Sequence, residues 1–139
     1  MVKPRTVRAH KVTHPVLGVA SWPEIRDAAN ELRKDGNKYC SWCFGPVGGR
    51  FRTGCGGTCR EMINGVVYWS VQRRRVFKRD KFCWCGAYGE EVDHIIPVSL
   101  GGTGDLWNLR LLCIPHHKME TDRLKREGAA FVAAWRGND

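Results

Sequence analysis

Residues 91–117 read EVDHIIPVSLGGTGDLWNLRLLCIPHH, and this stretch decides the fold that the sequence predicts. Asp93 and His94 lie near the end of an apolar segment, a glycine turn follows, and two histidines stand where a helix is expected to begin. An Asp-His dipeptide is unremarkable by itself, and a lone histidine is more often structural than catalytic. Potential metal ligands lie at both ends of the stretch, so a hairpin and a helix are expected to converge there.

One set of potential ligands belongs to an earlier part of the chain. It forms a CxxC pair and a CxxxC pair with glycines between them, made of Cys40, Cys43, Cys55 and Cys59. Such pairs suit a structural zinc ion, because each pair fits on one tight turn or helix start. Free buried thiols and oxidised pairs are the alternatives.

A second set frames the stretch itself. Cys83, Cys85 and Cys113 remain, and an odd number argues against a complete disulfide set. His116 follows Cys113 by three residues and completes four ligands for a second structural zinc. Residues two apart on an extended chain share a face, which allows Cys83 and Cys85 to bind together. The alternative is that one of them is a small core residue.

The composition favours a polyanionic partner. The 139 residues include 23 Lys and Arg against 14 Asp and Glu, a formal charge of +9, and basic surfaces bind nucleic acid by releasing counterions. No apolar run approaches the ~20 residues of a membrane span, and no signal-peptide core is present. We therefore expect no membrane partner and an intracellular location, cytoplasmic or nucleoid, or nuclear in a eukaryote. In a reducing compartment, clustered cysteines are expected to bind metal.

The sequence divides into three parts. Residues 1–20 are expected to form a basic arm, either disordered or gripping phosphate. Residues 21–75 contain the first cysteine set and a helix over residues 21–36, which Ser21 and Glu24 begin as a capping box. Residues 76–139 contain the central stretch and a closing helix over residues 116–136, with a possible break at Gly128. His10 and His14 lack ligand partners nearby and are expected to be solvated.

Several basic residues are candidates for contact with nucleic acid. Residues 61–80 are mixed, with Met62, Val66, Trp69 and Arg73 at helical spacing although Gly65 weakens a helix there. The same segment contains a dense basic run that comprises Arg73, Arg74, Arg75, Lys78 and Arg79. Most of these side chains are expected to be solvated, with some facing a nucleic-acid backbone. Arg110 and Lys118 are further candidates, although a surface salt bridge is an equal alternative for Arg110. The six tryptophans are expected to lie mainly in the core, Trp107 included, and stacking on bases is the less favoured alternative.

The region around residues 76–125 resembles the HNH nucleases, also called His-Me finger or ββα-metal nucleases. The resemblance rests on elements that stand in the family's order: Asp93-His94-Ile-Ile-Pro97, Gly101-Gly102, Asp105-Leu-Trp-Asn108-Leu109 and Cys113-x-x-His116-His117. Arg79-Asp80 and Cys85-Gly86 resemble the family's lead-in. Three features depart from the pattern: CxC replaces CxxC, His116 replaces a cysteine, and Glu120 replaces a basic residue. The preceding cysteine module is similar to one found in some zinc-finger annealing helicases.

This resemblance implies an α+β fold, with a zinc-stapled ββα-metal core after an N-terminal helix and a four-cysteine zinc-knuckle module. It implies that His94 is the general base, that Asp93 and His117 hold a catalytic Mg²⁺ or Mn²⁺ ion, and that Asn108 braces the loop and orients the base. Neighbouring side chains in a regular strand point to opposite faces, so the strand must bend or end at Asp93-His94.

The implied function is an endonuclease that hydrolyses phosphodiester bonds of double-stranded or structured DNA, leaving 5′-phosphate and 3′-hydroxyl ends. A non-catalytic zinc module that binds nucleic acid is the main alternative, and a protein-interaction module with structural zinc is another. A module that only binds nucleic acid does not need Asp93, His94 and His117 together, and failure to bind DNA at low salt would favour the protein-interaction module. No feature of the sequence indicates an oligomeric state.

Overall fold

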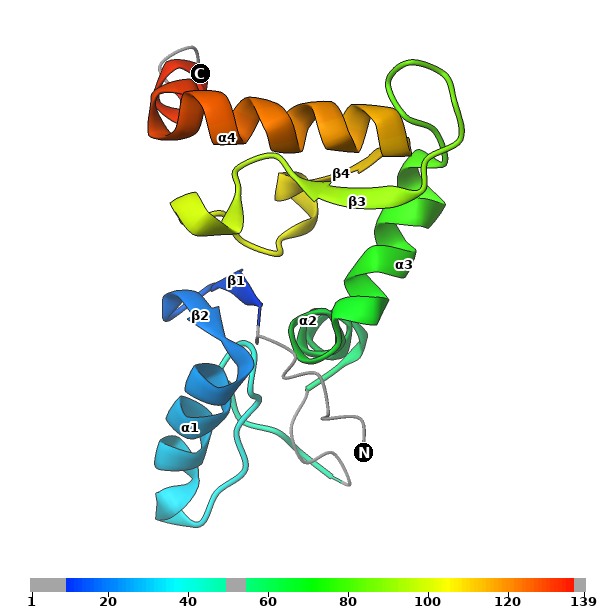
Figure 1. The fold of residues 1–139 in the computed structure, drawn as a ribbon. Helices are drawn as coiled ribbons and strands as arrows, with labels where there is room; N and C mark the ends of the chain where they lie inside the picture. The colour runs from blue at the N-terminus through cyan, green and yellow to red at the C-terminus, as the bar shows by residue number, and fades with distance from the viewer. Residues whose placement is uncertain (1–9, 50–54, 137–139) are drawn as a thin grey trace, which may run out of the picture. The chain divides into compact units, whose positions relative to one another are not determined.

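The computed structural model describes residues 10–49 and 55–136, with side chains described as far as residue 128. The fold is α+β, as the sequence predicts, and contains two small antiparallel sheets and four α-helices among the described residues (Figure 1). The chain divides into two compact units, residues 1–69 and residues 70–139. The sequence analysis placed this boundary at residues 75/76. None of the described helices is both long and apolar enough to cross a membrane.

Unit 1 is built around a short hairpin and two helices. Strands β1 (Lys11–His14) and β2 (Gly18–Ser21) pair antiparallel and lead into α1 (Trp22–Leu32). The backbone N–H of Ser21 donates to the Glu24 carboxylate at 2.8 Å, which is the predicted capping box. A 3-10 turn, η1 (Arg33–Asp35), and helix α2 (Gly57–Val67) follow. Their apolar side chains form one core, made of Val12, Ala20, Ile25, Cys40, Trp42, Val47, Ile63 and Val66.

The hairpin corrects the expectation of a basic arm over residues 1–20. Residues 11–21 form β1, β2 and the turn between them, while the arm's first nine residues lie outside the described residues. His14 is only 1% exposed, so the expectation that it is solvated was wrong. Its Nδ1 accepts the N–H groups of Val16 and Leu17, and its ring packs against Trp42. His10 bonds the carbonyl of Gly65 and is half-buried.

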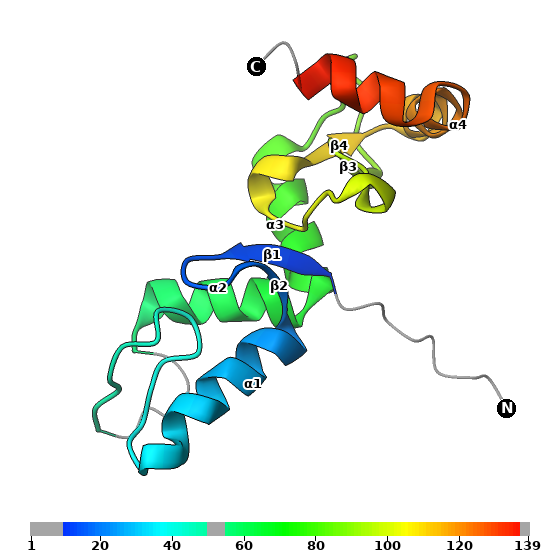
Figure 2. The same cartoon turned by 90° about the vertical axis from the view of Figure 1, so that its left-hand side faces the viewer.

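Unit 2 contains the predicted ββα arrangement. Strands β3 (Glu91–His94) and β4 (Leu109–Leu112) pair antiparallel, with Asp93 opposite Arg110 and His94 opposite Leu109. Helix α4 (Ile114–Arg136) packs against β3 (Figures 1 and 2). Two 3-10 turns, η2 (Val98–Leu100) and η3 (Leu106–Asn108), lie in the connection between the strands. Gly128 leaves helical geometry inside α4, at the break that the sequence predicts.

Helix α3 (Trp69–Asp80) is hydrogen-bonded to the β3–β4 hairpin. The sequence indicated helical spacing within a mixed segment over residues 61–80, and the structure has two helices there, α2 and α3, separated at the extended residue Tyr68. Gln72 donates to the carbonyl of Gly104 at 2.7 Å, and the Asp80 carboxylate accepts the N–H of Leu111 at 3.2 Å. These bonds attach β4, and the loop that joins β3 to β4, to helix α3. A hairpin of two four-residue strands is only marginally stable by itself, so these contacts with α3 stabilise it.

Candidate active site

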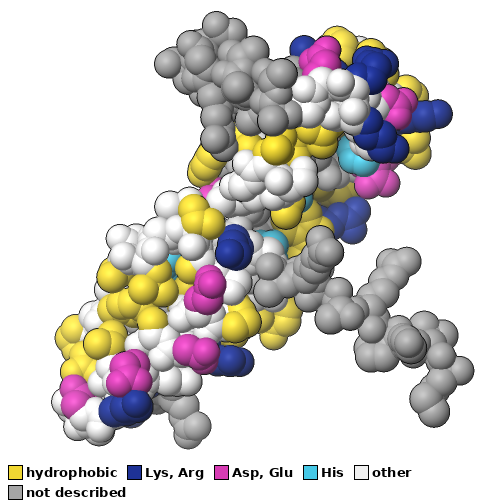
Figure 3. Space-filling view, turned by 60° about the vertical axis from the view of Figure 1, so that its left-hand side comes forward, with side chains coloured by type: hydrophobic (Ala, Val, Ile, Leu, Met, Phe, Trp, Pro, Cys, Tyr) yellow, Lys and Arg dark blue, Asp and Glu magenta, His cyan; other side chains and the backbone are white. Residues whose placement is uncertain are grey.

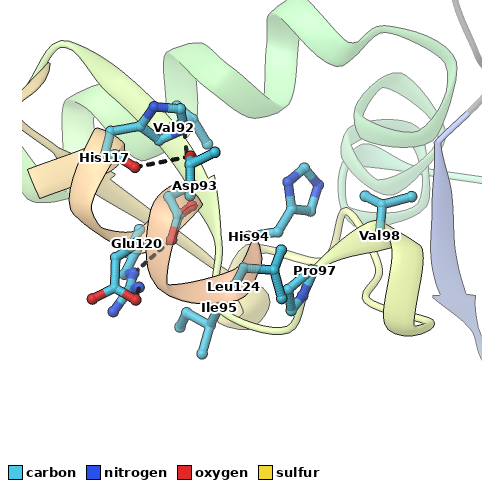
Figure 4. A pocket seen from close by; sticks show the side chains of 11 residues that line it. Val92, Asp93, His94, Ile95, Pro97, Val98, His117, Glu120 and Leu124 are labelled. Carbon is cyan, nitrogen blue, oxygen red and sulfur yellow. Dashed lines mark hydrogen bonds and ion pairs between the residues drawn. The ribbon is translucent and has the colours of Figure 1, made fainter. Parts of the chain in front are cut away.

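A pocket lies between the β3–β4 hairpin and α4 (Figure 4). It is lined by Val92, Asp93, His94, Ile95, Pro97, Val98, Arg110, His117, Glu120, Thr121 and Leu124. Strand β3 ends at His94, and the neighbours Asp93 and His94 both line this pocket. The predicted end of the strand at this dipeptide is confirmed.

Asp93 and His117 form the part of the pocket that suits a metal ion. Asp93 Oδ1 lies 3.9 Å from His117 Nε2, and the carboxylate is the more buried of the two groups. One ion about 2.1 Å from each atom can span at most about 4.2 Å, so a single Mg²⁺-sized ion reaches both. In Figure 4 the carboxylate faces His117, and the His94 ring lies on the other side of Asp93, toward Pro97 and Val98.

Arg110 and Glu120 line the same pocket, and the sequence analysis gave Glu120 no such place. Arg110 Nε donates to Asp93 Oδ2 at 2.9 Å, and its Nη2 lies 3.6 Å from the Glu120 carboxylate. Arg110 therefore occupies one oxygen of Asp93 and leaves Oδ1 toward His117. The salt bridge that the sequence analysis considered for Arg110 is present, and its contact with phosphate stays a prediction. Glu120 lies one helical turn beyond His117, a spacing that could have placed it in the pocket.

Asn108 holds the loop that begins next to His94. It is 0% exposed, and its side-chain oxygen accepts the N–H of Ile96 at 2.8 Å. Its amide donates to the carbonyls of Ile96 at 3.1 Å and Thr103 at 2.7 Å. These three bonds tie both sides of the loop together directly after the strand end. Asn108 thus has a bracing position, as the sequence analysis expected, and it does not line the pocket.

Gly102 packs closely inside this loop, so we predict that Gly102→Ala disrupts it. A Cβ there would lie 1.7 Å from the carbonyl oxygen of Ile96. Because the obstacle is backbone, the loop must shift, and we expect a loss of about 2 kcal/mol or more in unfolding free energy. Thermal and urea denaturation measure it.

Gly101→Ala is the matched control, because no atom lies near its Cβ position and only its left-handed backbone, φ +86°, opposes a side chain. It should cost about 1 kcal/mol. Equal effects of the two substitutions would contradict the close packing at Gly102.

The second cysteine set forms a compact cluster at the start of α4. The ligand atoms of Cys83, Cys85, Cys113 and His116 all lie within 4.8 Å of one another. Cys113 Sγ lies 3.1 Å from His116 Nδ1 and 3.9 Å from Cys85 Sγ. The edges of a tetrahedral zinc site are about 3.8 Å long for two sulfur ligands, so these distances fit zinc. Burial disfavours ionisation of Cys83, but the backbone N–H groups of Cys85 and Cys113 outweigh it and lower the pKa of the thiol to about 6.

The first cysteine set forms an equivalent cluster in unit 1, from Cys40, Cys43, Cys55 and Cys59. Cys55 Sγ lies 3.6 Å from Cys43 Sγ and 3.5 Å from Cys59 Sγ, distances too long for disulfide bonds. Burial and the neighbouring thiols raise the pKa of Cys59 to about 12. Because neighbouring thiolates repel one another, we expect the four thiols to be ionised together only around a cation. Both clusters could hold zinc.

The basic residues that the sequence proposed for nucleic-acid contact differ in their surroundings. Arg79 is held by the fold: it pairs with Asp80 and donates to the carbonyls of Leu106 and Leu109. Its side chain is still exposed, so its contact with nucleic acid stays a prediction. Figure 3 shows Lys and Arg side chains beside Asp and Glu, not one continuous basic face. The other exposed candidates are Arg73, Arg74, Lys78 and Lys118, whereas Arg75 is half-buried and donates to Gln72.

Comparison with known proteins identifies the class of this site. Residues 81–123 match the model of the HNH endonuclease family. The matched segment contains β3, β4, the first turns of α4 and all four ligands of the second cluster, so the similarity to HNH endonucleases covers the candidate active site, as the resemblance implied. No curated protein and no solved structure matches the chain. The likeness of the first cysteine module to that of annealing helicases stays a prediction.

Proposed function

We propose that this protein is a metal-dependent endonuclease that hydrolyses DNA phosphodiester bonds. The proposal depends chiefly on one observation: Asp93 Oδ1 lies 3.9 Å from His117 Nε2 in a pocket that His94 also lines. A carboxylate, an imidazole for a cation and a second imidazole for a proton are the groups that such a hydrolysis needs. Two protein ligands also leave coordination positions for phosphate and water.

His94 acts as the general base. Its neutral imidazole takes a proton from the attacking water, whose oxygen forms a new bond to phosphorus while the bond to the 3′ oxygen breaks and that oxygen takes a proton from solvent. The position at the end of β3, next to the loop that Asn108 braces, holds the ring near the reacting phosphate. The products then carry a 5′-phosphate and a 3′-hydroxyl.

Asp93 and His117 hold a Mg²⁺ or Mn²⁺ ion. When bound, this ion supplies positive charge that stabilises the negative charge developing on the phosphate and the leaving oxygen. Arg110 keeps Asp93 in its orientation by donating to Oδ2, which leaves Oδ1 for the ion. The fixed carboxylate therefore loses little side-chain freedom when the ion binds.

The metal requirement provides the test of this function. Wild-type protein should nick plasmid DNA with Mg²⁺ or Mn²⁺ and stop when both are chelated. Asp93→Asn should raise the Mn²⁺ concentration for half-maximal cleavage by about tenfold or more, because it removes the charge of a metal ligand. The measurement is the cleavage rate of a labelled plasmid at increasing Mn²⁺ concentration.

Glu120→Gln is the matched control, since it removes an equal charge from the same pocket but at a group that faces Arg110. Its effect on the Mn²⁺ requirement should be clearly smaller. If both variants behave alike, Asp93 has no special part in binding the ion. A wild-type protein that binds DNA without cutting it in either metal would instead be the non-catalytic zinc module.

A further inference from the structure

Three aromatic side chains are exposed on the loop that carries the first two ligands of the second cluster. This loop, the aromatic loop, spans residues 81–89. Trp84 is 71% exposed, Tyr88 is 78% exposed and Phe82 is 49% exposed. The other residues of the aromatic loop are Lys81, two cysteines, two glycines and Ala87, so it exposes no branched aliphatic side chain. Its exposed surface is aromatic and cationic.

The aromatic rings are held in place by the fold. The Trp84 ring lies over the His116 imidazole, with centroids 4.3 Å apart, and the Phe82 and Tyr88 rings pack at 5.2 Å. The N–H of Cys83 donates to the carbonyl of Ala87 at 2.8 Å, which closes the turn between them. Rings that are already ordered lose little conformational entropy when a flat partner stacks on them.

Two exposed lysines lie beside the aromatic loop. Lys78 and Lys81 are exposed at its base, and within the described residues neither forms an ion pair. Asp80, before the loop, is paired with Arg79 at 2.6 Å, whereas the two glutamates that follow the loop, at residues 90–91, are exposed, so a nucleic-acid backbone is expected on the lysine side. Aromatic faces next to lysines are the combination with which proteins bind single-stranded nucleic acid, because every base has a face that can stack.

The aromatic loop is also directly connected to the proposed catalytic pocket. Trp84 packs on His116, and the next residue, His117, lines the pocket and lies beside Asp93. Both histidines belong to the first turn of α4, so a strand whose phosphate is in the pocket can place a neighbouring base at the aromatic loop. In an intact duplex the faces of that base are covered by its stacked neighbours.

We propose that Trp84 and Tyr88 form a stacking site for an unpaired nucleobase close to the scissile phosphate. This inference rests on the proposed endonuclease function, and it narrows the substrate to DNA with unpaired bases at the cut, such as a single strand, an overhang or a branch point. Phe82 supports the Tyr88 ring, and Lys78 and Lys81 attract the backbone of the same strand.

The test separates stacking from charge. Binding of a fluorescein-labelled oligothymidylate of about 12 nucleotides, within the usual range of single-strand binding sites, is measured by anisotropy without catalytic metal, beside an abasic strand of equal length and charge. Wild type should bind the oligothymidylate about tenfold or more tightly than the abasic strand, since one stacked base contributes about 1–3 kcal/mol. Trp84→Ala with Tyr88→Ala should bind both strands alike, and Trp84→Phe should keep most of the preference.

Trp107→Ala is the matched control, because Trp107 is 62% exposed elsewhere in the same unit, contrary to its expected packing role. It should keep the preference, and equal zinc content confirms that each variant is folded. If the double variant retains the wild-type preference for bases, the inference is wrong and the aromatic loop is free to contact a protein. This result leaves the nuclease proposal intact when DNA is still cut, whereas failure to cut both the plasmid and a labelled branched DNA, with the preference for bases present, rejects the nuclease alone.

Discussion

His94→Ala should lower the rate of DNA cleavage by about 10²–10⁴-fold, the usual contribution of a general base. His94 ends β3 and lines the pocket, whereas Asp93 and His117 face each other beside it. The variant therefore removes the group that takes the proton and leaves the metal ligands in place. The measurement is single-turnover cleavage of a labelled oligonucleotide at saturating Mn²⁺, so that the rate reports the chemical step.

Two further measurements identify the lost function as proton transfer. Added imidazole should restore part of the activity of His94→Ala, because the truncated side chain leaves space for a free base. Binding of Mn²⁺, measured by calorimetry, should stay within a few-fold of wild type. Cleavage at the wild-type rate would remove His94 from the mechanism, and loss of Mn²⁺ binding together with activity would make it a metal ligand instead.

The parts of the site that the sequence predicted are those that local spacing determines. The CxxC and CxxxC pairs predict the first cluster, because each pair lies on one turn. Cys113 and His116 are three residues apart at the start of α4, so their side chains meet on one face. The position of Asn108 was also foreseen from the motif, and its three bonds show why the loop needs an amide there.

The parts that the sequence did not predict depend on contacts between distant residues. Arg79 was expected only to bind nucleic acid, and the carbonyls of Leu106 and Leu109 accept its hydrogen bonds from 27 and 30 positions away. A carbonyl carries no sequence signal, so nothing along the chain distinguishes this arginine from Arg74. His14 was misjudged for the same reason, since its partners in the core come from a separate segment, residues 41–44.

Cys113→Ser should remove one of two bound zinc ions and unfold unit 2. Cys113 is buried with Cys83 and Leu112 in a small core cluster, and the hairpin beside it has only two four-residue strands. Binding of structural zinc in small domains is worth roughly 10–16 kcal/mol, more than such a hairpin can provide by packing. His94 and His117 are then no longer held in one pocket, so the cleavage rate should fall at least as far as it does in His94→Ala.

Cys55→Ser is the matched variant, because it removes one thiol from the other cluster, which lies in unit 1. It should also lose one zinc ion, while the amide resonances of β3, β4 and α4 stay folded in NMR spectra. Metal content by mass spectrometry and these spectra together measure both variants. If Cys113→Ser keeps two zinc ions and a folded unit 2, Cys113 is not a ligand on which the second cluster depends, since three remaining ligands and a water would then suffice.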